Sequence, residues 1–144
     1  MRKLCSFSVI CALGVVMVGI LPASALAREV VVTDANNGQE VTLQRGDTLV
    51  VRLASNPTTA YSWHTVLSPT SIVSLSRARY IPGPCPAGNV GCGGIDEFRF
   101  VPSARALGAT FQMGEWLRML SLRPFDPGVE GAQLWQVDVT FNPE

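Results

Sequence analysis

Turn-forming residues divide this chain into short segments, and their spacing limits what the chain can fold into. The 144 residues include 13 Gly and 10 Pro, which interrupt the sequence roughly every ten to fifteen residues beyond the N-terminal region. Between these interruptions, apolar and polar side chains alternate with the period of two that is typical of half-buried β-strands. No segment has a convincing helical period. Short strands at this spacing favour a β-sandwich.

The expected strands are rich in β-branched and aromatic residues and are bounded by turn signals. They cover residues 30–33, 40–43, 48–53, 61–66, 72–80, 95–101, 109–113, 116–122 and 134–141. We expect an all-β domain without internal repeats.

The first 27 residues have the composition of a secretory signal peptide. Arg2 and Lys3 precede an apolar run over residues 4–21, and small residues at Ala25 and Ala27 form a cleavage site. An uncleaved membrane anchor is the alternative, because the apolar run is of borderline length for a bilayer. The Pro after this run and the cleavage site argue against an anchor. We therefore expect residues 1–27 to be removed and residues 28–144 to form one periplasmic or secreted domain.

The charge of the expected mature domain excludes one broad class of function. Residues 28–144 hold nine basic and eleven acidic side chains and no Lys. Binding to nucleic acid through bulk positive charge needs clustered Lys and Arg, so a nucleic-acid partner is not expected. We also expect no membrane contact after cleavage, no cofactor and a monomer.

Cys85 and Cys92 are the two cysteines that remain after cleavage. Exported thiols meet an oxidising environment, and the six residues between the two cysteines allow a closed loop. We predict a disulfide, which stabilises the fold by roughly 2–3 kcal/mol in the loop-entropy description. A metal site is the alternative, but two Cys and one His make a poor ligand set.

Three loop segments carry unusual residues. In Asn56-Pro-Thr-Thr-Ala-Tyr61, Pro57 fixes φ and restricts Asn56 to an extended conformation, which makes the turn rigid. Gly91-Cys-Gly-Gly94 allows close backbone approach, and no Lys follows it as a phosphate loop requires. Arg123-Pro-Phe125 presents an Arg and an aromatic residue, which are typical anchors of protein interfaces.

Together these segments resemble the motif set of the chagasin-type inhibitors of cysteine peptidases, in the same order along the chain. The resemblance covers essentially all of residues 28–144. It implies an immunoglobulin-like β-sandwich of about seven to eight short antiparallel strands, with the three loops forming a wedge at one end. That wedge would enter the active-site cleft of papain-like peptidases reversibly. The implied peptidase-binding residues are Asn56, Pro57, Thr58, Thr59, Ala60, Tyr61, Gly91, Cys92, Gly93, Gly94, Arg123, Pro124 and Phe125.

Two residues depart from the family pattern. Ala60 stands where the family usually has Gly, and is strained if the position requires a positive φ; otherwise Ala stiffens the loop. Phe125 replaces the commoner Trp and retains an aromatic anchor without the indole donor. The disulfide is an addition to the family pattern.

Two other classes of function fit fewer features of this sequence than inhibition does. Catalysis has little support, since His64 lies on an expected strand and a Cys-His pair needs a free thiolate. An exported adhesion or carbohydrate-binding module would use aromatic residues as a platform. Candidates for that platform are Trp63, Phe98, Phe100, Phe111, Trp116 and Trp135, although aromatic residues of a sandwich mostly lie in its core.

Overall fold

The structure is a computed structural model that describes residues 27–125 and 131–144. Apart from Ala27, the predicted signal peptide lies outside the described residues. Within the described ranges, no helix is long and apolar enough to cross a membrane.

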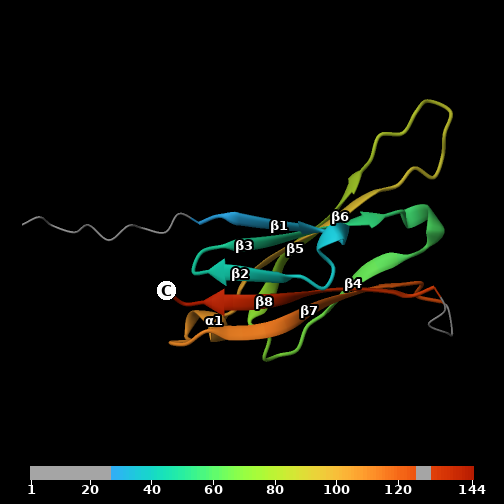
Figure 1. Ribbon diagram of the computed structural model, residues 1–144. Coiled ribbons are helices and arrows are strands. Elements are labelled where there is room, and N and C mark those ends of the chain that lie inside the picture. The colour runs from blue at the N-terminus through green and yellow to red at the C-terminus, as the bar shows by residue number, and fades with distance from the viewer. Residues whose placement is uncertain (1–26, 126–130) are drawn as a thin grey trace, which may run out of the picture.

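Eight strands form two four-stranded sheets packed face to face, which confirms the predicted all-β sandwich (Figure 1). The first sheet has the order β1-β3-β6-β5 and the second the order β2-β8-β7-β4. The strands are β1 (Glu29–Thr33), β2 (Glu40–Gln44), β3 (Thr48–Ser55), β4 (Ser62–Val66), β5 (Val73–Pro82), β6 (Gly94–Pro102), β7 (Met113–Leu122) and β8 (Gln133–Asn142).

Two of the strand pairs are parallel, so the expectation of antiparallel strands is wrong at these two places. β1 pairs with β3 and β2 pairs with β8 in parallel, whereas the other four pairs are antiparallel. The chain reverses between β1 and β2 and again between β2 and β3 while it changes sheet. After two reversals β3 runs in the direction of β1, and the two are neighbours in one sheet.

Local structure differs from the predicted pattern at two further points. Residues 109–112 are not a strand, because a short helix α1 (Ala104–Leu107), capped by the Ser103 hydroxyl, precedes β7. The alternation expected over residues 72–80 is interrupted by a shift of register between Leu75 and Arg77. This irregularity places Arg77 and Arg79 on the outer face of the first sheet.

The core lies between the two sheets. It is made by every second residue along the strands, the one whose side chain faces the other sheet. Phe100, Phe141 and Leu117 are almost fully buried. The Trp135 indole joins the layers, because its Nε1 donates to the Thr33 carbonyl oxygen at 3.1 Å. Most of the aromatic residues considered for a sugar platform are core residues or pack against the core, namely Trp63, Phe98, Phe100 and Trp135.

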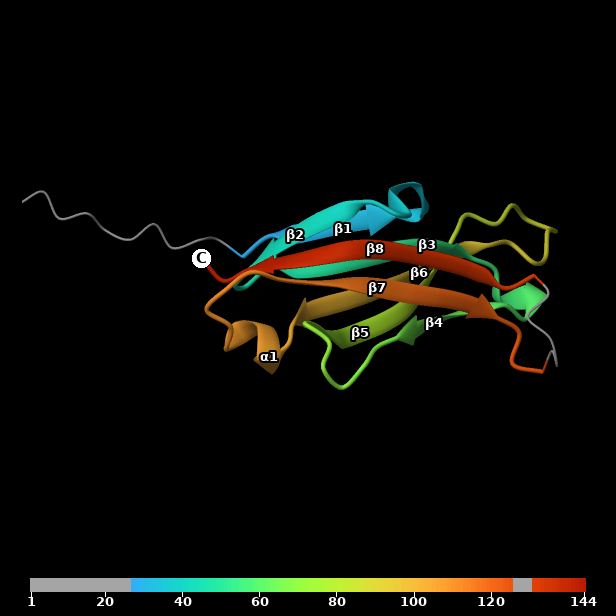
Figure 2. The ribbon, with the colours of Figure 1, turned by 60° about the horizontal axis from the view of Figure 1, so that its bottom comes forward.

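The two ends of the sandwich carry different connections. In both views the β3–β4 and β5–β6 connections and the end of β7 lie at one end, and α1 and the C-terminus lie at the other (Figures 1 and 2). The three loop segments singled out in the sequence therefore gather at a single end of the molecule.

Candidate functional site

The candidate site is the end of the sandwich formed by three segments. These are the β3–β4 loop (residues 56–61), the β5–β6 loop (residues 83–93) and the post-β7 segment (residues 123–125). The structure brings all the predicted binding residues to this end, with Gly94 as the first residue of β6.

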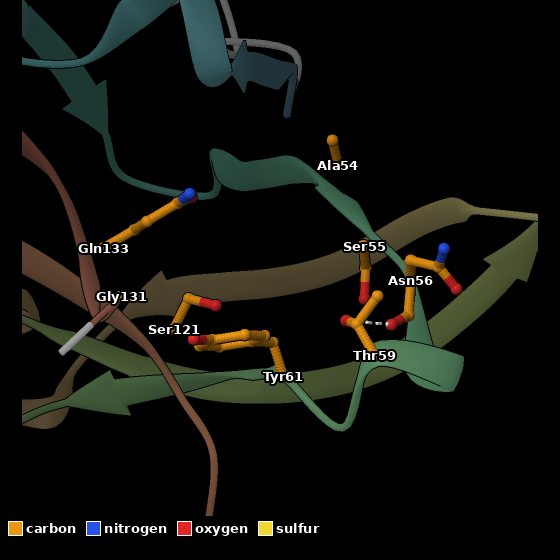
Figure 3. Close-up of a pocket in the computed structure, with 8 residues that line it drawn as sticks. All are labelled: Ala54, Ser55, Asn56, Thr59, Tyr61, Ser121, Gly131 and Gln133. Carbon is orange, nitrogen blue, oxygen red and sulfur yellow. Dashed lines mark hydrogen bonds between the residues drawn. The ribbon is translucent and has the colours of Figure 1, made fainter. Parts of the chain in front are cut away.

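The β3–β4 loop is a single turn of 3₁₀ helix, η2 (Pro57–Thr59), capped by the side chain of Asn56. Asn56 Oδ1 accepts hydrogen bonds from the Thr58 backbone N–H at 3.2 Å and from the Thr58 hydroxyl at 2.7 Å. The Thr59 hydroxyl donates to the Asn56 carbonyl oxygen at 2.7 Å (Figure 3). Pro57 at the first helical position fits this turn, because its fixed φ suits a helix start. The loop is therefore held by its own side chains.

Ala60 ends this turn in the left-handed region, with φ 63° and ψ 5°. It is the one non-Gly residue with a positive φ among residues 27–125 and 131–144. Of the two possibilities raised by the sequence, the strained one is therefore correct. The conformation matches the preference for Gly at this position in the family that the motifs resemble.

The base of the β3–β4 loop is closed between the two sheets. Trp63 on β4 donates its indole N–H to the Ala54 carbonyl oxygen on β3 at 2.9 Å. This bond joins the strand that enters the loop to the strand that leaves it, so the two ends of the loop are held together.

The β5–β6 loop is closed by the predicted disulfide, which the structure contains between Cys85 and Cys92 with a Cα–Cα distance of 5.5 Å. The Gly83 N–H donates to the Gly93 carbonyl oxygen at 3.0 Å at the base of the loop. Gly91 has φ +76°, and a Cβ there would lie 3.3 Å from the Thr58 hydroxyl oxygen. Gly91 is thus required both by its conformation and by the close approach of the neighbouring loop.

Two side chains link the three segments to one another. Asn56 Nδ2 donates to the Gly91 carbonyl oxygen at 2.9 Å, which joins the β3–β4 loop to the β5–β6 loop. Arg123 Nε donates to the Thr59 carbonyl oxygen at 3.2 Å, and the Arg123 guanidinium lies 4.4 Å from the centroid of the Tyr61 ring. The post-β7 segment is thereby fixed to the β3–β4 loop. Asn56 and Arg123 position the site as well as belonging to it.

Two apolar side chains at this end of the molecule are almost fully exposed. Phe125 is 95% exposed and Val90 is 96% exposed. Phe125 was predicted from the sequence, whereas Val90 was missed because it lies outside the motifs. The exposure of Val90 could have been predicted, because it is an aliphatic residue flanked by the turn residues Gly88-Asn89 and Gly91 inside the loop that the disulfide closes.

A small polar cavity lies behind the β3–β4 loop. It has a volume of about 180 Å³, and its lining residues are Ala54, Ser55, Asn56, Thr59, Tyr61, Ser121, Gly131 and Gln133 (Figure 3). Pockets for drug-sized molecules span roughly 300–1,000 Å³, so this cavity is better suited to water. A more open hollow of about 470 Å³ lies between the β3–β4 and β5–β6 loops, and its lining residues are Ala54, Ser55, Asn56, Gly93 and Gly94.

His64, the residue considered for catalysis, has no carboxylate partner among the described residues. His64 is exposed on β4 and contacts only the Ser62 hydroxyl, at 2.9 Å, among the described hydrogen bonds. Both residues lie on the same short strand, and neither is in contact with a described carboxylate. Across residues 27–125 and 131–144, no three His, Cys, Asp or Glu side chains are grouped to hold a metal ion.

Fold and site together define a binding protein: a rigid β-sandwich that presents three interlinked loops at one end. The family model "Chagasin family peptidase inhibitor I42" matches residues 42–139. The chain therefore belongs to the chagasin family of peptidase inhibitors. As a member of this family it is a peptidase inhibitor.

Several solved structures share this fold. A cysteine protease inhibitor, EhICP2 from Entamoeba histolytica, has a TM-score of 0.66 at 22% identity, covering 81% of this chain and 98% of that chain. PbICP-C, solved in complex with falcipain-2, has a TM-score of 0.51 at 15% identity over 81% and 100% of the chains. Leishmania mexicana ICP has a TM-score of 0.51 at 26% identity, covering 74% of this chain and 90% of that chain. A search of curated proteins finds no significant match.

Proposed function

We propose that this protein inhibits its target peptidase by inserting the three interlinked loops into the active-site cleft. The β3–β4 loop enters the centre of the cleft, with Thr58 and Thr59 beside the catalytic cysteine. The β5–β6 loop and the post-β7 segment contact the walls on either side. The binding is reversible, and no covalent bond forms.

The observation that carries this proposal is the pair of links between the loops. Asn56 and Arg123 hold three segments that are far apart in the sequence in one fixed arrangement. A site that is ordered before binding loses little conformational entropy when the partner arrives, so more of the contact energy appears as affinity. An inhibitor interface of standard size buries about 800 Å² on each partner, which three loops can supply.

The backbone of the β3–β4 loop explains why such a loop would resist cleavage. The Asn56 carbonyl oxygen accepts from the Thr59 N–H at 3.0 Å, and the Pro57 carbonyl oxygen accepts from the Ala60 N–H at 3.2 Å. The Thr59 carbonyl oxygen accepts from Arg123. Nucleophilic attack needs a carbonyl aligned with the thiolate at near-contact distance. Carbonyl groups turned inward and already hydrogen-bonded do not offer that alignment.

The inhibitor acts outside the cytoplasm in this proposal, as a monomer. The support is the predicted signal peptide of residues 1–27 and a disulfide of the kind that persists in oxidising compartments. PbICP-C, a solved structure with the same fold, is in complex with falcipain-2. One copy of the loop end is sufficient for one cleft.

A charge placed at the tip of the β3–β4 loop tests the proposal. Thr58→Glu should weaken inhibition of papain by about a hundredfold or more, because an uncompensated charge buried in an interface costs about 3 kcal/mol. Thr110→Glu, on the exposed connection between α1 and β7 at the opposite end, is the matched control and should inhibit like the wild type. Inhibition constants come from steady-state titration, and circular dichroism verifies the fold. Equal inhibition by both variants would refute insertion of this loop.

A further inference from the structure

Four of the nine arginines in residues 28–144 lie together on the outer face of the β1-β3-β6-β5 sheet. Arg52 on β3 and Arg79 on β5 lie directly opposite Glu97 on β6, one on each side. Arg77 on β5 lies opposite Arg99 on β6 in the next row of the same face. We call the set Arg52, Arg77, Arg79 and Arg99 the arginine face.

A fully buried carboxylate fixes two of these guanidinium groups. Arg52 Nε donates to Glu97 Oε2 at 2.9 Å, and Arg79 donates to Glu97 Oε1 through Nε at 2.8 Å and Nη2 at 2.7 Å. Burial alone raises the pKa of Glu97, but the hydrogen bonds and charges of the two arginines outweigh it and hold the pKa below its usual value. Each guanidinium binds Glu97 with some of its donors, and both arginines remain about two-fifths exposed.

The arginine face keeps a net positive charge. Glu97 and Glu29, which pairs with Arg99, supply two negative charges against four positive ones. Arg77 is exposed, has no ion-pair partner among the described residues, and faces Arg99 across the strand pair. Like charges directly opposite each other on a sheet are unfavourable, and an acidic partner would relieve this contact. On the outer face of the other sheet, Glu40 lies opposite Asp138, so the positive charge is concentrated on one side.

The arginine face adjoins the three-loop site. Arg52 is four residues before Asn56 on β3, about 13 Å at the rise of a β-strand. β5 and β6 run from the arginine face directly into the disulfide-closed β5–β6 loop (Figure 1). An inhibitor interface buries only about 800 Å² per partner, so much of the peptidase surface around the cleft would stay outside the contact and within the field of these charges.

We propose that the arginine face selects, by electrostatic steering, papain-like peptidases whose surface beside the cleft is acidic. This inference rests on the proposed function and adds to it the charge of the preferred target. The net charge of the arginine face, four arginines against two glutamates, is too small for a nucleic-acid binding site, which neutralises many phosphates. It is sufficient to raise the association rate of an oppositely charged protein.

Charge reversal at Arg77 tests the proposal without breaking a described contact. Arg77→Glu puts a carboxylate opposite Arg99, a pairing that favours the sheet, and it retains a charge on an edge strand, which protects against edge-to-edge aggregation. Arg45→Glu, in the turn between β2 and β3 at the opposite end, makes the same change in net charge and is the control; because it removes the hydrogen bond from Arg45 Nη1 to the Leu107 carbonyl oxygen, its Tm is compared with that of the wild type. Association and dissociation rates are measured by progress curves with one acidic and one basic papain-like peptidase.

The proposal makes a signed prediction for each peptidase. At about 10 mM salt, where the Debye length is about 30 Å, Arg77→Glu should slow association with the acidic peptidase about fivefold and speed association with the basic one. Both effects should disappear at about 1 M salt, and dissociation rates should stay unchanged. Equal effects of Arg45→Glu, or the same change with both peptidases, would overturn the proposal while leaving inhibition intact. Absence of inhibition by the wild type would instead overturn the proposed function.

Discussion

Replacing Ala60 with Gly should stabilise this protein, although Gly usually destabilises when it replaces Ala. Ala60 has φ 63° at the end of η2, and the left-handed region costs a residue with a Cβ about 1–2 kcal/mol. Gly removes that cost but gives the unfolded chain more freedom, which opposes folding by about 0.4–1 kcal/mol. The difference predicts a gain of about 0.5–1 kcal/mol, or about 2–5 °C in Tm for a domain of this size.

Thermal and urea unfolding, followed by circular dichroism, measure this gain. Ala35→Gly is the matched control, because Ala35 is exposed in the three-residue 3₁₀ helix η1 (Asp34–Asn36) and has no positive φ. This variant should lose about 0.5–1 kcal/mol. If Ala60→Gly lost stability as Ala35→Gly does, the left-handed conformation of Ala60 and the strain argument would both be refuted.

Three further predictions concern the site and the arginine face. Phe125→Ala should raise the dissociation rate of the peptidase complex about thirtyfold, the size of a hot-spot loss of about 2 kcal/mol; because Phe125 is 95% exposed, Tm should not change, and a fall in Tm would indicate a structural role. Asn56→Asp keeps an acceptor for the helix cap but cannot donate to the Gly91 carbonyl, so affinity should fall about fivefold; unchanged affinity would mean that this link does not order the loops. Since the pKa of Glu97 is lower in the folded protein than in the unfolded chain, its stabilisation is complete above the ordinary carboxyl pKa and is lost as the pH falls through the folded value. Urea unfolding across the acidic range should show this loss, and a Glu97→Gln variant with the same pH dependence would contradict it.

The sequence contained enough local information for the strands but not for their pairing. Alternation of apolar and polar residues located β6 and β8 within about two residues, because a half-buried strand shows which face is buried. The same pattern does not distinguish parallel from antiparallel neighbours, which is why the pairs β1-β3 and β2-β8 were missed. Pairing depends on where the chain changes sheet, and that is a property of the whole fold.

The sequence predicted that three loops meet at one end of the sandwich but not how they contact one another. The three motifs identified the loop residues, and the spacing of Cys85 and Cys92 predicted the disulfide that the structure contains. The donation from Asn56 to Gly91 spans 35 residues, and the contact of Arg123 with Thr59 spans 64. Such contacts exist only once the ends of distant strands meet. The burial of Glu97 was hidden for the same reason, since both of its arginine partners come from other strands.

The disulfide between Cys85 and Cys92 has a practical consequence for work with this inhibitor. A papain-like peptidase attacks with a thiolate, so assays of these enzymes contain dithiothreitol or a similar reductant that keeps the catalytic sulfur active. Cys85 is exposed, and the same reductant can therefore open the ring that carries Val90 and Gly91. The reductant that keeps the peptidase active thus also reduces the disulfide of the inhibitor. An affinity measured in a reducing buffer is therefore expected to be lower than the affinity of the inhibitor with its disulfide intact.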